Sequence, residues 1–302
     1  MADAWKTYPI EFSGGLISNL SPLQQGINAP GSATKLINYE PSVEGGYKRI
    51  EGFSKFGGAS AVTVDAQTSL IRGIVRFNNK IIVARGVKLL ESADGTSWTT
   101  LTSSLGGSDK VRFAKYNFDG NEKLIIVDGT NKPFTYDGTT VTAITNVSSD
   151  FTGCERVLVF KNHLFFSNGS TLLFSPPFED PDALQNLASP PSEIFAVADG
   201  AGIQDIGEVI TDLIVFREQL IIFSEKTIKR YSGTNIADFV LQSVSEDLGA
   251  VNSDTAKEVG GDVMFLGPDG LRLLSATDRI GDFGLAVVSK PIQTELTNVI
   301  NT

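Results

Sequence analysis

A five-fold repeat is the feature of this 302-residue sequence that most restricts its fold. The segment KLIIVDG begins at Lys123, and similar segments begin at Lys80, His163, Gln219 and Asp262. Each copy has a polar residue, three or four apolar residues and a turn, and a second apolar segment follows. The starts are 43, 40, 56 and 43 residues apart. A period of about 40–45 residues, with about four short antiparallel strands in each unit, is typical of a β-propeller blade.

The segments that precede the copies predict the first strand of each blade. We expect these strands at 70–77, 110–118, 156–161 and 212–217, whereas the fifth copy has only the weaker DTAKEVGG before it. The inner strands are apolar on both faces, as is typical of strands packed between neighbouring sheets. The predicted fold class is therefore all-β: a β-propeller of about five or six four-stranded blades with an extended N-terminal segment. A β-sandwich or two small barrels, whose hairpins would look alike, is the alternative.

Composition along the chain suggests three parts. Residues 1–58 lack the repeat and are rich in Gly, Asn, Ser and Pro, so we expect an extended N-terminal segment that makes assembly contacts. The propeller is expected at 59–290. Residues 291–302 are expected to form a C-terminal helical segment or the start of a continuation. The long interval between the third and fourth copies holds an insertion at 176–200.

Charge and cysteine content exclude several classes of function. The formal net charge of −10 gives the chain no general attraction to phosphate backbones, so we expect no specific nucleic-acid binding. Cys154 is the single cysteine, which excludes an intrachain disulfide and a CxxC metal site, and we expect it in the core. No apolar run approaches 18 residues, and we expect no contact with a membrane. The first 25 residues do not have the pattern of a signal peptide.

The sequence shows no set of residues that points to catalysis. His163 is the single histidine and opens an apolar strand, and no GxSxG elbow accompanies it, so we interpret it as a strand residue. Acidic residues are plentiful but lie mostly in turns, without the positioned pair that a glycosidase needs. Glu179, Asp180 and Asp182 lack the spacing of an EF-hand and fit the first turn of a short helix better. We therefore predict no enzyme activity, no cofactor and no metal.

The turn SADGTSW looks like a degenerate Asp-box, one residue short of the usual spacing. In such a turn the Asp side chain binds backbone N–H groups and the Trp packs between blades, which favours a structural role here. Because Asp-boxes also occur in sialidases, a carbohydrate-binding propeller of a tail fibre or host-recognition protein is the alternative function. Trp98 or Tyr136 would then contact the glycan, and a glycoside hydrolase is the third hypothesis. The residues of the turn are Ser92, Asp94, Gly95 and Trp98.

A stretch near the N-terminus, NYEPSVEGGYKRIEGF at 38–53, resembles one near the start of many tailed-bacteriophage virion proteins. These are the tail nozzle and head-to-tail stabilisation proteins of short-tailed phages and related cyanophage proteins, in which a β-propeller follows the stretch. Residues 269–293 look like the region where such propellers close. Nozzle proteins are usually much longer than this chain. The matching positions are Asn38, Tyr39, Pro41, Gly45, Gly46, Tyr47, Lys48, Arg49 and Gly52.

The resemblance implies a structural virion protein in the neck or tail, a nozzle or head-to-tail stabilisation subunit in a ring around the channel through which DNA leaves. The implied partners are other copies of the chain and portal, adaptor or other tail proteins. DNA would pass an acidic wall without specific binding. We expect Gly45 and Gly46 to form a turn with positive φ. Two interpretations of Lys48 and Arg49 stand equally: they pair with an acidic neighbour, either Glu44 or a partner subunit, or they are ordinary exposed strand residues.

Overall fold

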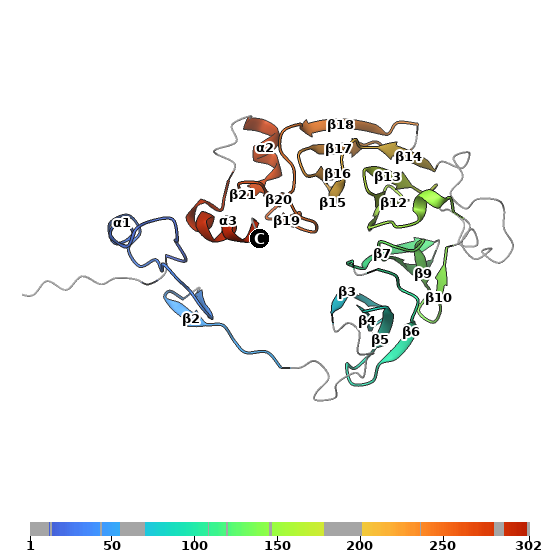
Figure 1. Cartoon of the computed structure of the whole chain (residues 1–302), viewed down its shortest axis with the longest axis horizontal. Coiled ribbons are helices and arrows are strands. Elements are labelled where there is room, and N and C mark those ends of the chain that lie inside the picture. The colour runs from blue at the N-terminus through green and yellow to red at the C-terminus, as the bar shows by residue number, and fades with distance from the viewer. Residues whose placement is uncertain are drawn as a thin grey trace, which may run out of the picture. The chain divides into compact units, whose positions relative to one another are not determined.

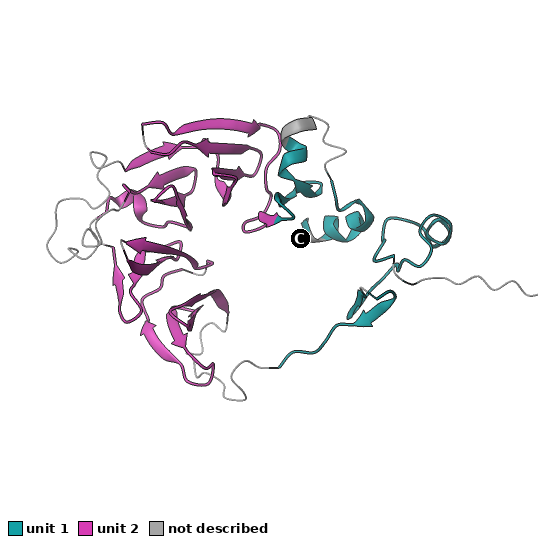
Figure 2. Cartoon of the chain, turned by 180° about the vertical axis from the view of Figure 1, so that it is seen from behind, with its two compact units in different colours: residues 1–54, 259–302 teal, residues 55–258 magenta. Residues whose placement is uncertain are grey.

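The structure is a computed structural model, and two compact units make up the chain (Figure 2). Unit 1 consists of residues 1–54 and 259–302, and unit 2 of residues 55–258. None of the helices in the described part of the chain is long and apolar enough to cross a membrane. The residues described are 12, 14–42, 44–54, 70–107, 109–118, 120–144, 147–177, 201–235, 237–280 and 287–300. The insertion residues Glu179, Asp180 and Asp182 lie outside them.

Unit 2 contains four antiparallel four-stranded sheets, each built from strands that are consecutive in the chain. Each strand pairs with the next, so every sheet is a simple meander (Figure 1). The first sheet has β3 (Ile71–Phe77), β4 (Lys80–Arg85), β5 (Lys88–Ser92) and β6 (Thr99–Thr102); the second has β7 (Arg112–Phe118), β8 (Asn121–Val127), β9 (Phe134–Tyr136) and β10 (Val141–Ala143); the third has β11 (Arg156–Phe160), β12 (His163–Asn168), β13 (Thr171–Phe174) and β14 (Gly202–Asp205); the fourth has β15 (Ile210–Phe216), β16 (Gln219–Ser224), β17 (Ile228–Ser232) and β18 (Val240–Ser245).

The first strands of all four sheets, β3, β7, β11 and β15, line one common pocket. In a sandwich of two sheets, the first strands of four successive hairpin sheets would not converge in this way. The sheets are therefore the blades of a β-propeller, numbered here blade 1 to blade 4 from the first sheet, and the predicted fold class is confirmed.

The fifth repeat forms a shorter sheet, in the order β19-β20-β21, from strands Lys257–Val259, Asp262–Gly267 and Gly270–Leu273. Its β20–β21 hairpin belongs to unit 1. The second apolar segment of this copy is LRLLSATD at 271–278, which the repeat predicts to be a strand, but helix α2 (Leu274–Ile280) begins directly after β21. In the described residues, four blades thus have four strands and this sheet has three.

Tight turns connect the first and second strands of three blades. In each turn two successive residues have positive φ, between 45° and 62°, the conformation of a type I′ hairpin. This turn follows the right-handed twist of the strands and fixes which residues face each other across the hairpin. The turn residues are Asn78 and Asn79 in blade 1, Lys161 and Asn162 in blade 3, and Arg217 and Glu218 in blade 4.

The core lies between neighbouring blades. Blades 1 and 2 share a cluster in which the rings of Phe77 and Tyr136 have their centres 5.7 Å apart. Blades 2 and 3 share a second cluster, which includes the buried Cys154, and burial raises the pKa of this thiol to about 12. Blades 3 and 4 share a third cluster that includes Phe165. Because blade 2 has blade 1 on one side and blade 3 on the other, the side chains of its second strand, β8, are buried on both faces.

Unit 1 contains short elements. Helix α1 (Pro22–Asn28) begins with a capping box, in which Ser21 and Gln24 each bind the other's backbone N–H. A hairpin of β1 (Tyr39–Pro41) and β2 (Tyr47–Arg49) follows, so the segment that we expected to be extended also contains a helix and a hairpin. Near the C-terminus of unit 1 lie the 3-10 helix η5 (Lys290–Ile292) and helix α3 (Gln293–Ile300). A further 3-10 helix, η1 (Ser149–Phe151), belongs to unit 2 and precedes blade 3.

Candidate functional site

The stretch at 38–53 that resembles phage virion proteins contains the β1–β2 hairpin. Tyr39 faces Arg49 and Pro41 faces Tyr47 across the two strands. Gly45 and Gly46 form the turn with φ of +92° and +77°, values that a residue with a side chain rarely adopts.

The outer residues of the motif flank this turn. Asn38 has φ +59° just before β1, and its carbonyl oxygen accepts a hydrogen bond from the N–H of Ile50. Gly52 lies exposed beyond β2. Lys48 pairs with Glu40 on the facing strand, at 3.1 Å between Nζ and Oε1, and not with Glu44, the intrachain partner we had expected.

Tyr47 anchors the hairpin to the preceding loop. Its phenol oxygen lies 3.1 Å from the carbonyl oxygen of Gly15 and 2.9 Å from that of Gly31. Leu16 and Ala33 join the two sides of that loop through a parallel bridge. The hairpin therefore has a fixed attachment at Tyr47, while Lys48 and Arg49 remain exposed to solvent.

Large apolar side chains are exposed along the same N-terminal part of unit 1. Isolated exposed apolar side chains are ordinary, but several within one short segment are typical of a surface that binds another protein. Phe53 is fully exposed and Leu23 on helix α1 is 76% exposed. We call this set the N-terminal apolar surface: Phe12, Leu23, Ile27, Ile37, Tyr39, Ile50 and Phe53.

The Asp-box-like turn lies between β5 and β6 and is held by its own hydrogen bonds. Asp94 Oδ1 accepts from the N–H groups of Thr96 and Ser97 at 2.8 and 2.9 Å. The bond from Ser97, followed by those from Thr96, holds the pKa of Asp94 well below its usual range. Ser92 Oγ accepts from the N–H of Gly95, and Trp98 Nε1 donates to the carbonyl oxygen of Gly95. The polar groups of the motif are thus used within the turn.

Tyr136 is unsuited to the glycan contact that the sequence suggested. Its side chain is completely buried between blades 1 and 2. Its hydroxyl donates to Glu91, which also pairs with Lys80 at 2.9 Å. Burial, followed by the bond to Glu91, raises the pKa of this phenol. A sugar ring therefore has no access to Tyr136.

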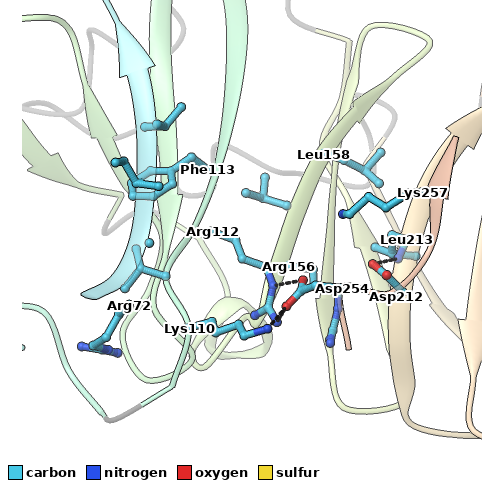
Figure 3. A pocket seen from close by; sticks show the side chains of 15 residues that line it. Arg72, Lys110, Arg112, Phe113, Arg156, Leu158, Asp212, Leu213, Asp254 and Lys257 are labelled. Atoms are coloured by element: carbon cyan, nitrogen blue, oxygen red, sulfur yellow. Dashed lines mark hydrogen bonds and ion pairs between the residues drawn. The ribbon is translucent and has the colours of Figure 1, made fainter. Parts of the chain in front are cut away.

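A pocket of about 420 Å³ opens where the first strands of the four blades, β3, β7, β11 and β15, converge (Figure 3). We call these first strands the inner strands. Its lining carries five basic and two acidic residues, although the whole chain has a net charge of −10. The charged residues are Arg72, Lys110, Arg112, Arg156, Lys257, Asp212 and Asp254; the others are Gly73, Ile74, Val75, Val111, Phe113, Val157, Leu158 and Leu213.

Arginines at the start of three inner strands link each blade to the next. Arg72 on β3 donates to the carbonyl oxygen of Asp109, which lies just before β7. Arg112 on β7 donates likewise to the carbonyl of Glu155 before β11, at 2.8 Å.

The same link recurs once more along the propeller. Arg156 on β11 donates to the carbonyl of Ile210 at the start of β15, at 2.9 Å. At the fourth position the polarity is reversed, because Asp212 on β15 accepts from the N–H of Ala256. Guanidinium groups at the blade starts therefore hold successive blades in register.

Two cations at the pocket share one carboxylate. Asp254 accepts from Nε and Nη2 of Arg112, both at 2.8 Å, and from Nζ of Lys110 at 2.7 Å. Burial by itself would raise the pKa of Asp254, but the hydrogen bonds from Arg112 and Lys110 outweigh it and hold that pKa well below its usual range. Asp254 is therefore ionised at neutral pH.

Sequence reasoning located the inner strands but missed the role of these arginines. The signal was present: in LIRGIVRF, KVRFAKYNF and RVLVFK an Arg stands four to six residues before the Phe that ends the strand. An Arg inside an apolar strand is costly to bury unless its donors are satisfied, so its recurrence in aligned copies indicates a common partner. The residues in question are Arg72, Arg112 and Arg156.

His163 is buried among aromatic rings and has no catalytic partner among the described residues. Its Nδ1–H donates to the carbonyl oxygen of Ser175 at 2.5 Å, and its ring lies 5.3 Å from that of Phe239. Burial lowers the pKa of His163, against the opposing effect of the bond to Ser175. In the described residues, no group of three or more His, Cys, Asp and Glu side chains could hold a metal ion.

The buried histidine predicts a dependence of stability on pH. Because the pKa of His163 is lower in the folded chain, the unfolded chain binds the extra proton first, near pH 6.5. The contribution of the neutral imidazole is complete above that pH and is lost as the pH falls from there toward the folded pKa. Urea unfolding at pH 7.5, 6.5 and 5.5 should show that the free energy of unfolding decreases as the pH falls, and that the decrease is smaller in His163→Asn than in the unaltered chain. An equal dependence of the free energy of unfolding on pH in the two proteins would contradict the prediction.

Comparison with known proteins identifies no family for the chain. No family model matches the chain, and no curated protein matches it. Among solved structures it is similar to the extracellular domain of the one-component system BT4673 from B. thetaiotaomicron, at 12% identity over 71% of this chain and 33% of that chain, with a TM-score of 0.44. The WD40 domain of Neurospora crassa Pan2 gives 10% identity over 67% and 60%, with a TM-score of 0.44. YCF48 bound to D1 peptide gives 12% over 69% and 65%, also at 0.44. The chain covers less than two thirds of each of these proteins.

Proposed function

We propose that the chain is a structural protein of a tailed-bacteriophage virion, a subunit of the neck or tail that binds other subunits through unit 1. The N-terminal apolar surface carries this proposal. Its apolar side chains flank the hairpin whose sequence resembles that of nozzle and head-to-tail stabilisation proteins, and they would be covered in an assembly.

The propeller supports a scaffold role in this proposal. Its polar groups at the Asp-box-like turn and at the blade starts bind one another or the backbone, so they serve the fold and not a reaction. The net charge of −10 would let DNA pass the assembled ring without adhering. Since the pocket at the inner strands has more basic than acidic residues, other surfaces would have to supply that acidic wall.

The carbohydrate-binding alternative has less support. Of the two aromatic residues that would contact the glycan, Tyr136 is buried, and Trp98 already donates its indole N–H to Gly95 within its own turn. No other observation on the described residues favours it over a structural subunit.

Two measurements on the full chain test the proposal. Analytical ultracentrifugation should show a discrete oligomer that dissociates in the double variant Ile37→Ser, Phe53→Ser. Val209→Ser, which alters an apolar residue of unit 2 that is as exposed as Ile37, serves as the control and should leave the oligomer intact. Mass spectrometry of purified tailed particles from the phage or prophage that encodes the chain should detect it. A chain that stays monomeric at every concentration and is absent from those particles would refute the proposal.

A further inference from the structure

The pocket at the inner strands of blades 1 to 4 has more basic than acidic side chains in its lining. Of its five cations, Lys110 and Arg112 share the single carboxylate of Asp254. Arg72 is satisfied by four backbone carbonyls and belongs to the fold. Two cations remain, Arg156 and Lys257.

Arg156 is buried but only partly bonded. Its side chain is 6% exposed, and its ion pair with Glu155 and its hydrogen bond to the carbonyl of Ile210 both start at Nη1. Its Nε is buried without a partner among the residues that the structure describes. Burial, followed by the nearby charge of Arg112, lowers the pKa of Arg156, against the opposing effect of Asp212, Glu155 and Asp254. A buried donor without an acceptor costs free energy that a bound acceptor would restore.

The other acidic residue of the lining does not fill this role. Both oxygens of Asp212 accept from backbone N–H groups, those of Leu213 and Ala256. Burial raises the pKa of Asp212, which weakens it further as a counter-ion. Lys257, on β19, also lines the pocket, and its side chain is exposed.

Apolar side chains form the remainder of the lining. In Figure 3 Phe113 and Leu158 both lie above the cluster of Arg112, Lys110 and Asp254, Phe113 to the left and Leu158 to the right. The pocket thus combines cationic groups with an apolar wall, and its volume of about 420 Å³ accommodates a small organic molecule but not a DNA duplex.

We propose that this pocket binds a small organic anion that has one oxyanion head group, such as a carboxylate, on an apolar body. The head group accepts hydrogen bonds from Arg156 and Lys257, and the apolar body packs against Phe113 and Leu158. This site is separate from the N-terminal apolar surface, so its failure would leave the proposed assembly function untouched.

Isothermal titration calorimetry of the full chain tests the proposal with four probes: hexanoate, acetate, 1-hexanol and a 12-base-pair DNA duplex. Hexanoate should bind at one site. Acetate lacks the apolar body and 1-hexanol lacks the charge, so each should bind at least about 10-fold more weakly. The DNA duplex should not bind.

Variants of the pocket sharpen the test. Lys257→Gln changes an exposed side chain, so the fold should persist while hexanoate affinity falls about 10-fold or more. Lys226→Gln removes an exposed lysine outside the pocket and should leave affinity unchanged. Arg156→Gln should also weaken binding, provided that circular dichroism shows the folded chain.

Each possible result of these titrations either supports or contradicts the proposed site. Loss of hexanoate binding in Lys257→Gln but not in Lys226→Gln supports the site. Absence of hexanoate binding at millimolar concentration overturns it, as does equal binding of hexanol, equal binding of acetate, equal affinity in both variants, or competition by the DNA duplex.

Discussion

Replacing Arg72 by Met should lower the free energy of unfolding by about 3 kcal/mol, because several buried carbonyl oxygens lose their donor at once. The Arg72 guanidinium donates to the carbonyls of Gly86 and Gly106 at 2.8 Å, and to those of Asp109 and Asp128. Three of these four acceptors lie beyond blade 1, in the connection to blade 2 or in blade 2 itself. Met keeps much of the apolar stem but supplies no donor. The measurement is urea unfolding followed by circular dichroism.

Arg76→Met is the matched control for this prediction. Arg76 lies on the same strand, β3, but its side chain is exposed and donates to Asn79 in the adjoining turn. Its loss should change the free energy of unfolding by less than about 0.5 kcal/mol. Arg72→Lys should recover little of the stability, since one ammonium cannot reach acceptors on several sides as the planar guanidinium does. Equal effects of Arg72→Met and Arg76→Met would show that the link between blades contributes nothing.

The strands that the sequence predicted best are the second strands of the blades. β4, β12, β16 and β20 begin at the residues where the repeat placed them, and β8 begins two residues earlier, at Asn121. These strands are buried on both faces, so burial imposes a continuous apolar run, and a turn must follow because the blade is narrow.

The outer strands could not be located from the sequence. β6, β10, β14 and β18 read TTLT, VTA, GIQD and VLQSVS, and most of their side chains are exposed or half-buried. Without a buried face, no apolar periodicity marks them. Their positions depend on pairing with the strand before them, which is a tertiary property.

The pocket was hidden from sequence reasoning for a related reason. Arg156, Asp212 and Lys257 are far apart in the chain and come together only because their segments converge at the centre of the blades. Net charge averages over the whole surface, so a value of −10 gives no sign of a locally basic site. Helix α2 was missed because LSATDRI continues an apolar strand without a glycine or proline between them.

Replacing Phe165 by Ala should lower the free energy of unfolding by about 3–5 kcal/mol, the cost of removing a completely buried ring from a packed core. Phe165 on β12 has no exposed surface and lies between blades 3 and 4. Its ring centre is 5.2 Å from that of Phe174, 5.9 Å from that of Tyr231 and 6.0 Å from that of Phe239. Offset and edge-to-face contacts of this kind add to the effect of burial.

A graded series makes this last prediction specific to the packing between blades 3 and 4. Phe165→Leu retains most of the buried volume and should cost less than Phe165→Ala, whereas Val240→Ala, on the exposed edge strand β18, should change stability by less than about 0.5 kcal/mol. Hydrogen exchange should locate the loss: in Phe165→Ala the amides of β12 and β16, which supply the two sides of the cluster, should lose protection before those of β4. If Phe165→Ala cost no more than Val240→Ala, the aromatic cluster would not hold these blades together, and the repeat would have to be stabilised by its hairpins alone.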